Sequence, residues 1–412
     1  MHFVVVIFLA VCNLGLIVSS EVTRVPPDQD VGKSMTEIVA SRGYTIETHN
    51  VTTADGYILT MFRIPSSKNT QHTSSELGPP VILQHGLLDS SYTWVANFED
   101  ESLGYILSDQ GFDVWFGNNR GNRYGRNHVS KNPDDKTSGF WDFTWDDMAS
   151  FDAPAMINYV IDKTGYPSIG WVGHSEGTIQ MFAAGTSLEA NTNDYFQKAI
   201  KSLNIFVALA PVAYVDNLKT RLLVALAQTQ LPQRLYDRGY LEFLPYGPIE
   251  EIAPEICQVV DHACYFFLDT LCGPSRNLND SRIQVYVSQT PAGTSTMNIM
   301  HWTQGVVTPA FQKYDWGSAE ANQQHYGQDT PPQYDLGKLA VPTALFYGKH
   351  DYMADPTDVQ KILDQAPADK IVFTSYLDNY AHLDYTWAFN AKDYVYPDVV
   401  KQLSNYAATG KV

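Results

Sequence analysis

One serine of this chain stands in a pattern that is typical of nucleophilic catalysis. Residues 173–177 read GHSEG, the form G-x-S-x-G, between a buried-strand pattern and a helix pattern. In this strand–turn–helix context the pentapeptide predicts a sharp turn that exposes the hydroxyl of Ser175. The flanking glycines fit such a turn, because its backbones approach too closely for Cβ atoms. The predicted chemistry is attack of Ser175 on a carbonyl carbon.

A serine hydroxyl needs a general base and an orienting acid, expected in the chain order Ser, Asp/Glu, His. Asp351 follows one short apolar run, and His382 follows the next, 31 residues further along. That interval accommodates one helix and one strand. His350 precedes the acid and His301 falls inside a long insertion, so His382 is the preferred base.

Acyl transfer also requires backbone donors for the oxyanion. The segment His85-Gly86-Leu87-Leu88 directly follows an early apolar run. The N–H of Leu87 is therefore one expected donor. The N–H of Glu176, at the start of the helix after the nucleophile, is the other.

The elements that must position these residues are short apolar runs alternating with helical patterns. The runs that predict strands are 80–84, 112–116, 169–173, 205–209, 343–347 and 371–373. Helical patterns are found around 105–108, 147–163 and 178–187. This alternation predicts an α/β fold with a mostly parallel sheet covered by helices on both faces.

The interval from about 215 to 335 breaks this alternation, with scattered aromatic residues, helical patches and few strand candidates. We interpret it as an insertion above the carboxyl edge of the sheet. The predicted organisation is a signal peptide at 1–20, a first core part at 21–214, an insertion at 215–335 and a second core part at 336–412.

Composition excludes several classes of protein. The chain has 412 residues, of which 44% are hydrophobic and 17% charged, so it can bury a large core and is not disordered. Its net charge of −18 and the lack of a basic tract argue against nucleic-acid binding. The sequence pI of about 4.9 means that most of this charge is lost in an acidic lumen.

Residues 3–18 are mostly apolar, but too short to span a bilayer, and small residues follow before Glu21. This indicates a secretory signal peptide, and no later stretch predicts a transmembrane segment. A lumenal or extracellular protein gives meaning to two N-glycosylation sequons, at Asn50 and Asn279. The mature chain keeps three cysteines, for which one disulfide and one free thiol is the simplest arrangement. Their spacing predicts no metal site.

These motifs together resemble those of the acid lipases, the family of lysosomal acid lipase and gastric lipase. The resemblance covers nearly all of the mature chain. The segments that carry it are 37–44, 55–59, 63–65, 84–88, 113–118, 120–122, 242–245, 291–295, 301–302, Asp351, 354–356 and 382–384.

The resemblance implies an α/β-hydrolase core in which the insertion forms a largely helical cap and lid. It implies the triad Ser175, Asp351 and His382, with Leu87 and Glu176 at the oxyanion positions. Its substrates would be neutral lipid esters at a lipid–water interface, chiefly triacylglycerols and sometimes sterol esters, often cleaved at acidic pH. No cofactor is implied.

The resemblance also implies a Cys257–Cys264 disulfide with Cys272 free, although the first two cysteines lie closer together than is usual in the family. Position 176 is a second departure, because the best-known members have glutamine there. A carboxylate beside a developing oxyanion opposes the transition state, so we hypothesise that Glu176 favours activity in acid, where it can be protonated. The alternative is an exposed side chain that points away.

We therefore expect a secreted or lysosomal serine hydrolase acting on lipid esters through an acyl-enzyme. One alternative is a carboxylesterase for soluble esters on the same core. The other is a non-catalytic lipid-binding or yolk-type protein. Loss of a triad residue would be the signature of the second, and all three candidates are present.

Overall fold

The computed structural model describes residues 28–68, 77–191, 193–247, 250, 253–254, 257 and 261–407. The expected signal peptide at 1–20 lies outside the described residues.

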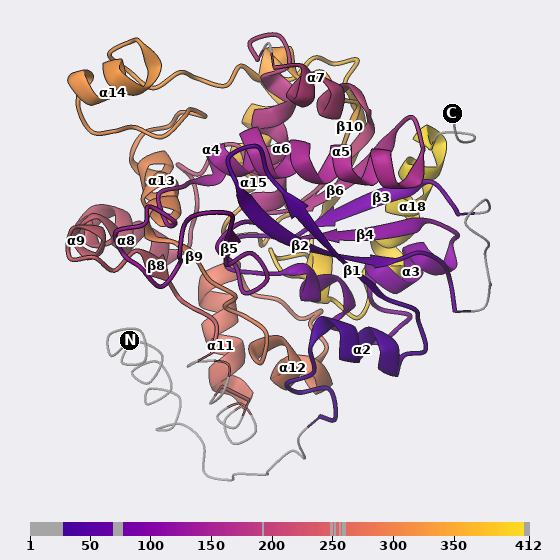
Figure 1. Ribbon diagram of the computed structural model, residues 1–412. Coiled ribbons are helices and arrows are strands. Elements are labelled where there is room, and N and C mark those ends of the chain that lie inside the picture. Colours follow the sequence, from indigo (N-terminus) through magenta and orange to yellow (C-terminus); the bar gives the residue numbers. More distant parts are fainter. Residues whose placement is uncertain are drawn as a thin grey trace.

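A single large sheet forms the centre of the molecule (Figure 1). Its strands follow the order β1-β2-β4-β3-β6-β7-β10-β11, and β5 pairs with β2. The strands are β1 Glu47–Thr52, β2 Tyr57–Ile64, β3 Pro80–Gln84, β4 Asp113–Gly117, β5 Asn127–His128, β6 Ile169–His174, β7 Leu203–Leu209, β10 Thr343–Gly348 and β11 Ile371–Leu377. From β4 to β11 every neighbouring pair is parallel, while β1, β2 and β5 pair antiparallel.

The six strands expected from the apolar runs are all present, and the predicted mostly parallel sheet is confirmed. β3, β4 and β6 are buried along their whole length. Continuous burial is the usual state of parallel strands covered on both faces, and it explains why these strands appear in the sequence as unbroken apolar runs.

Helices cover both faces of this sheet. The α-helices are α2 Met35–Ser41, α3 Leu103–Asp109, α4 Trp145–Asp147, α5 Ala153–Thr164, α6 Glu176–Thr186, α7 Asp194–Lys201, α8 Arg221–Thr229, α9 Leu231–Asp237, α11 Asp261–Cys272, α12 Ile283–Val287, α13 Thr296–Val307, α14 Ala319–Tyr326, α15 Pro356–Gln365, α16 Asp384–Trp387, α17 Ala391–Tyr394 and α18 Tyr396–Tyr406. A π-helical turn joins α4 to α5, namely η2 Met148–Asp152, and the 3-10 helices are η1 Ser91–Val95, η3 Asp280–Arg282 and η4 Leu336–Lys338.

Figure 1 shows α5 and α6 on one face of the sheet and α3 and α18 on the other. The carboxyl ends of the parallel strands point towards a group of helices that comprises α8, α9 and α11 to α13 (Figure 1). A short two-stranded ribbon, β8 Glu242–Phe243 with β9 Thr294–Ser295, lies among these helices. The insertion expected at 215–335 contains this group and the outlying α14, and its boundaries stay a prediction.

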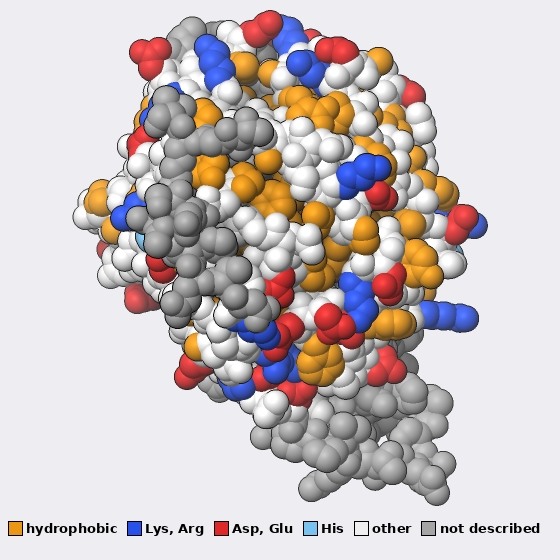
Figure 2. All heavy atoms as spheres, turned by 90° about the vertical axis from the view of Figure 1, so that its right-hand side faces the viewer, with side chains coloured by type: hydrophobic (Ala, Val, Ile, Leu, Met, Phe, Trp, Pro, Cys, Tyr) orange, Lys and Arg blue, Asp and Glu red, His pale blue; other side chains and the backbone are white. Residues whose placement is uncertain are grey.

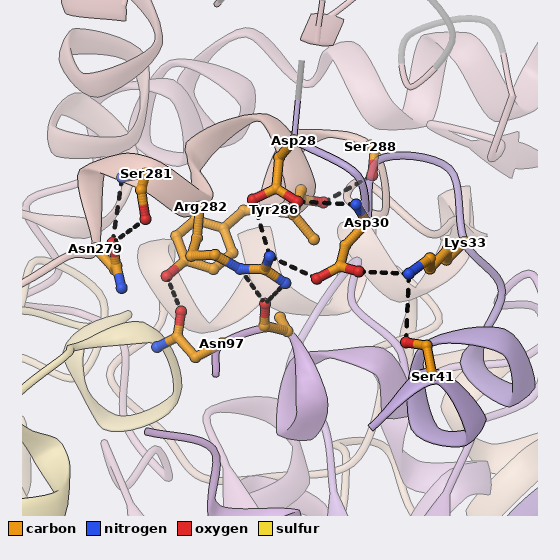
Figure 3. A network of polar contacts seen from close by, with 12 residues as sticks. Asp28, Asp30, Lys33, Ser41, Asn97, Asn279, Ser281, Arg282, Tyr286 and Ser288 are labelled. Atoms are coloured by element: carbon orange, nitrogen blue, oxygen red, sulfur yellow. Dashed lines mark hydrogen bonds and ion pairs between the residues drawn. The ribbon is translucent and has the colours of Figure 1, made fainter. Parts of the chain in front are cut away.

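A buried arginine ties the amino-terminal segment to this helical group (Figure 3). Arg282, at the end of η3, donates from Nη1 to Asp28 and Asp30 at 2.9 and 2.7 Å. Its Nε and Nη2 both donate to the carbonyl oxygen of Ala96. Lys33 adds a second cation on Asp30, at 2.7 Å. The network therefore joins three segments that are far apart in the chain.

The face on the right of Figure 1 is turned towards the viewer in Figure 2. Several groups of hydrophobic side chains occur there, separated by polar side chains and bordered by charges of both signs. Among the described residues no helix is both long enough and apolar enough to cross a membrane.

Candidate active site

Ser175 sits on the sharp turn between β6 and α6, as the GHSEG pattern predicts. Its backbone has φ 52° and ψ −115°, a conformation that L-residues rarely adopt. Strain of this kind persists only where the surrounding structure enforces it, and it is frequent at active sites. Ser175 is buried, yet it lines a cavity at the carboxyl edge of the sheet.

The two flanking glycines are required by close backbone approach. A Cβ atom on Gly173 would lie 2.4 Å from the carbonyl oxygen of Gly177. A Cβ atom on Gly177 would lie 2.5 Å from the carbonyl oxygen of Gln84. Because both obstacles are backbone atoms, neither can move aside at low cost, and no larger residue fits the turn.

The structure brings together the three residues that the sequence predicts for the triad. Nε2 of His382 lies 2.8 Å from Oγ of Ser175, and Nδ1 lies 2.9 Å from each carboxylate oxygen of Asp351. An ionised carboxylate only accepts hydrogen bonds, so Nδ1 must carry the proton. Nε2 is then the free acceptor for the serine hydroxyl. All three side chains are almost fully buried.

Backbone groups hold both partners of the histidine in place. Oδ1 of Asp351 accepts the N–H groups of Met353 and Ala354 at 2.9 and 2.7 Å. The N–H of His382 donates to the carbonyl oxygen of Cys272, at 3.2 Å. These bonds fix the imidazole between acid and nucleophile. Cys272 therefore contributes through its backbone, a role that spacing alone does not reveal.

His174 is a further residue that the sequence analysis did not single out. Its Nε2 lies 2.9 Å from the carbonyl oxygen of His382, so the ring must donate there. Burial, together with the nearby His382, lowers the pKa of His174 to about 3. The ring is therefore neutral, and it supports the loop that carries His382. The sequence signal for this role is the position of His174 directly before Ser175 in GHSEG.

The two expected oxyanion donors come from different elements, the loop after β3 and the start of α6. Leu87 follows β3, and its neighbour Gly86 is packed so closely that an added Cβ would lie 3.0 Å from Cβ of Ser175. Glu176 is the first residue of α6. Neither N–H donates to another described backbone group. The positive end of the α6 dipole adds to the attraction for an anion at this point.

The side chain of Glu176 is buried, so the alternative of an exposed side chain is wrong, although its carboxyl contacts α13 and does not line the cavity in front of Ser175. Its Oε1 accepts a hydrogen bond from Nδ2 of Asn298 at 2.7 Å and one from Nε1 of Trp302 at 2.8 Å. Both donors lie on α13, which covers this end of α6. Burial raises the pKa of Glu176 to about 7, and the two hydrogen bonds only partly oppose this rise. The carboxyl therefore changes charge near neutral pH.

A cavity of about 230 Å³ opens in front of Ser175 and His382. Most of its walls are aliphatic or aromatic, supplied by α8, α9, α11 and the residues around α12. Within the described part of the chain, no lysine or arginine lines it. The cavity is thus suited to an uncharged, apolar group attached to a reactive carbonyl.

The two histidines rejected as bases lie elsewhere. His301 stacks on Trp145 with ring centroids 4.1 Å apart, and its Nε2 lies 3.1 Å from the carbonyl oxygen of Gln312. The backbone N–H of His350 donates to the carbonyl oxygen of Tyr380. The imidazole that contacts Ser175 is that of His382.

A disulfide joins Cys257 to Cys264, with Cα atoms 5.8 Å apart, and Cys272 is a free thiol. Of the two sequon asparagines, Asn50 is exposed on β1. Asn279 is partly buried, and its Nδ2 donates to Glu101 at 2.8 Å. Use of these sequons stays a prediction. Among the residues that the structure describes, no group of three His, Cys, Asp or Glu could hold a metal ion.

Two protein-family models match parts of this chain. Residues 35–98 match a family described as a partial alpha/beta-hydrolase lipase region, and residues 79–200 match the alpha/beta hydrolase fold. Among solved structures, an esterase from Pyrococcus furiosus is a distant likeness, with a TM-score of 0.47 and 13% identity over 94% of this chain and 100% of that one.

Several curated proteins are much closer in sequence. Human gastric triacylglycerol lipase is 40% identical, over 92% of this chain and 93% of its own. The rat gastric triacylglycerol lipase is 38% identical over the same shares of the two chains. Human lysosomal acid lipase/cholesteryl ester hydrolase is 38% identical, over 92% of each chain. With this extent of similarity, the chain belongs to the acid lipase family of the α/β-hydrolases.

Proposed function

We propose that this protein hydrolyses carboxylic esters of neutral lipids, chiefly triacylglycerols and also sterol esters, at a lipid–water interface. The observation that carries the proposal is the hydrogen-bonded chain from Asp351 through His382 to Ser175, at the mouth of an apolar cavity. The names of its gastric and lysosomal relatives support the substrate class.

In the proposed reaction, Oγ of Ser175 attacks the ester carbonyl carbon while Nε2 of His382 takes the hydroxyl proton. The N–H groups of Leu87 and Glu176 stabilise the oxyanion. The tetrahedral intermediate collapses with cleavage of the ester C–O bond, and His382 passes its proton to the departing alcohol. Asp351 holds the imidazole in the required tautomer and stabilises its charged form.

The acyl-enzyme is then hydrolysed by the same groups. Water loses a proton to His382 as its oxygen attacks the acyl carbon, and the second intermediate expels the serine oxygen. His382 returns the proton to Ser175, and a fatty acid is released. This chain of steps uses only residues of the protein and water.

We further propose that Glu176 gives the reaction a preference for acid. The N–H of this residue is one of the proposed oxyanion donors, so a negative side chain at the same position opposes the developing charge. Protonation below about pH 7 removes that charge, as the raised pKa of Glu176 indicates. The side chain of Glu176 thus binds α13, and its charge changes how well the neighbouring N–H group stabilises the oxyanion.

The first experiment measures fatty-acid release from emulsified trioleoylglycerol and from a soluble short-chain ester, at pH 5 and pH 8. Ser175→Ala is the control, with an expected loss of at least about 10⁴-fold. Serine-dependent activity on the emulsion supports the lipase. Activity on the soluble ester alone favours the carboxylesterase, and no serine-dependent turnover favours a lipid-binding protein.

The second experiment compares the pH–rate profiles of the wild type and Glu176→Gln. With a pKa of about 7, the protonated fraction of Glu176 falls about fivefold between pH 7 and pH 8, so the wild type should lose up to about fivefold more activity than the variant over this interval. The amide oxygen of the substituted side chain can still accept hydrogen bonds from α13, so the variant isolates the charge. Identical profiles would contradict the role given to Glu176.

For localisation, we propose that residues 1–20 direct the chain into the secretory pathway. The mature enzyme would then act outside the cell or in the lysosomal lumen. We also propose that residues 215–335 form the cap and lid, because α8, α9 and α11 of this segment supply walls of the cavity.

A further inference from the structure

A second buried carboxyl, Asp89, lines the same cavity as Ser175 and His382. It ends the loop after β3 that carries the proposed oxyanion donor Leu87. Asp89 is two positions after Leu87 in the chain, so their Cα atoms are at most about 7.6 Å apart. The side chain is only 6% exposed. Asp89 is therefore part of the wall of the cavity that opens in front of Ser175.

The partners of this carboxyl are uncharged donors. Oδ1 accepts the N–H of Ser90 at 2.8 Å and the hydroxyl of Thr290 at 3.4 Å. The hydroxyl of Thr93, on η1, is a third donor. None of these groups neutralises a negative charge. Burial accordingly raises the pKa of Asp89 to about 7, although its hydrogen bonds act in the opposite direction.

The described residues around the cavity supply no permanent cation either. The other titratable residues lining it are His174, Cys272, Tyr286 and His382. His174 is neutral because its pKa is low, and burial raises the pKa of the Cys272 thiol above its usual range. Glu176, on α6, does not line the cavity, because its carboxyl is held by Asn298 and Trp302 of α13. Within this described lining, an anion in the cavity would meet negative charge and no lysine or arginine.

We propose that Asp89 is a specificity-determining residue, which admits uncharged acyl esters to the cavity and rejects the carboxylate form of the fatty-acid product. The proposal rests on the proposed function only in assuming that a fatty acid is formed in this cavity. An ester and the derived carboxylate have the same acyl chain, so apolar walls cannot distinguish them. A negative side chain in the wall of the cavity does so by charge.

The size of this discrimination follows from Coulomb's law. Two unit charges about 10 Å apart, at the effective dielectric constant of about 20 found in proteins, repel one another enough to weaken binding by roughly tenfold. Ionised Asp89 should therefore lower the affinity for a fatty-acid anion by that factor. The effect requires both groups to be ionised, so it should grow between pH 5 and pH 8.

The test measures binding of octanoate by calorimetry on the Ser175→Ala protein, with and without Asp89→Asn, at pH 5 and pH 8. The uncharged ligand 1-octanol is the matched probe, and Asp100→Asn, an exposed aspartate, is the matched variant. At pH 8, Asp89→Asn should bind octanoate roughly tenfold more tightly than its parent. Binding of octanol should change less than about twofold, and Asp100→Asn should behave as its parent.

Equal affinities of the parent and Asp89→Asn for octanoate at pH 8 would overturn the proposal. A parallel change for octanol would also overturn it, since a change of pocket shape would then suffice. If Asp89→Asn does not fold, Asp89→Ser serves the same comparison, because the hydroxyl of the substituted side chain can accept a hydrogen bond from the N–H of Ser90. Binding needs no turnover, so failure of the proposed hydrolysis is detected separately, in the assay with trioleoylglycerol.

Discussion

Two regions of this molecule bury carboxyl groups in opposite ways. In the network of Figure 3, Asp30 is fully buried but contacts Arg282 and Lys33. Arg42 is a third cation on this carboxyl. Burial alone would raise the pKa of Asp30, but hydrogen bonds from Lys33 and Arg282 hold it below its usual value. Near Ser175, Glu176 and Asp89 are buried among uncharged described partners, and their pKa values rise to about 7.

The difference separates stability from regulation by pH. The cations of the first region keep Asp30 ionised throughout the range from weakly acid to neutral, so this contact between segments does not change. The carboxyls near the nucleophile change charge within the same range. A protein with both arrangements can keep its fold in an acidic lumen while its active site becomes less negative there. This fits the preference for acid proposed above.

The largest effect should come from removing Arg282, the most deeply buried of the three cations in the first region. Arg282→Met leaves Asp28 and Asp30 without their shared partner, and loss of one member of a buried ion pair costs about 3–5 kcal/mol of unfolding free energy. Urea denaturation at pH 6 measures the change. Arg276→Met, at an exposed arginine nearby, is the matched control and should be nearly neutral. A loss below about 1 kcal/mol would remove the basis of the comparison.

The lowered pKa of Asp30 also determines how the free energy of unfolding depends on pH in this region. Because the pKa of Asp30 is lowered on folding, its contribution is present above the pKa of the unfolded chain and is lost as pH falls through the folded value. The deficit of Arg282→Met should therefore persist from pH 7 to pH 5. It should shrink only below about pH 4, where aspartate protonates in the unfolded chain.

Glu176→Gln should have the next largest effect, with the opposite sign. The folded wild type retains a proton on Glu176 up to about pH 7, whereas the unfolded chain releases it near the ordinary glutamate value of 4.5. Wild-type stability must then fall as pH rises between these values. Relative to the wild type, the variant should gain on the order of 2–3 kcal/mol from about pH 4.5 to pH 7. Thermal unfolding of both proteins across this range measures it, and parallel curves would show that the carboxyl does not titrate there.

Trp302→Phe tests the contact between α13 and Glu176 more finely. It deletes the Nε1–H donor and leaves Asn298 as the remaining partner. The expected cost is about 1–2 kcal/mol of unfolding free energy. Since that hydrogen bond lowers the pKa of Glu176, its loss should raise this pKa further and extend activity to higher pH. Trp316→Phe, at an exposed tryptophan before α14, also deletes one Nε1–H hydrogen bond, to Tyr326, and should leave the pH dependence of activity unchanged.

Much of the core was predictable because its signals are local. The unbroken apolar runs at 80–84 and 169–173 predict buried parallel strands, and both are found as β3 and β6. β1 was not predicted, because ETHNVT is polar and only one of its residues is buried. Its place in the sheet comes from antiparallel pairing with β2, which no local apolar run announces.

The same distinction applies to the candidate site. The types of Ser175, Asp351 and His382 follow from the chemistry of acyl transfer, and their order is the one typical of this fold. The structure brings them into contact. The partners of Glu176 could not be predicted in this way, since Asn298 lies 122 residues further along the chain. Whether a carboxyl is buried, and whether a cation accompanies it, depends on such long-range packing. The charge behaviour of the site is therefore information that only the folded chain contains.

The smallest effect is expected at a carboxyl that is not buried, and it completes the comparison. Lys198 and Asp162 form an ion pair at 2.7 Å, but both side chains are at least half exposed. Water screens such a pair, so Lys198→Met should change the unfolding free energy by no more than about 0.5 kcal/mol, and less at high salt. Urea denaturation at low and high salt checks this. If Lys198→Met lowered the unfolding free energy as much as Arg282→Met does, burial would not be what distinguishes the carboxyl groups of this protein. The contrast between the two buried regions would then have no physical cause.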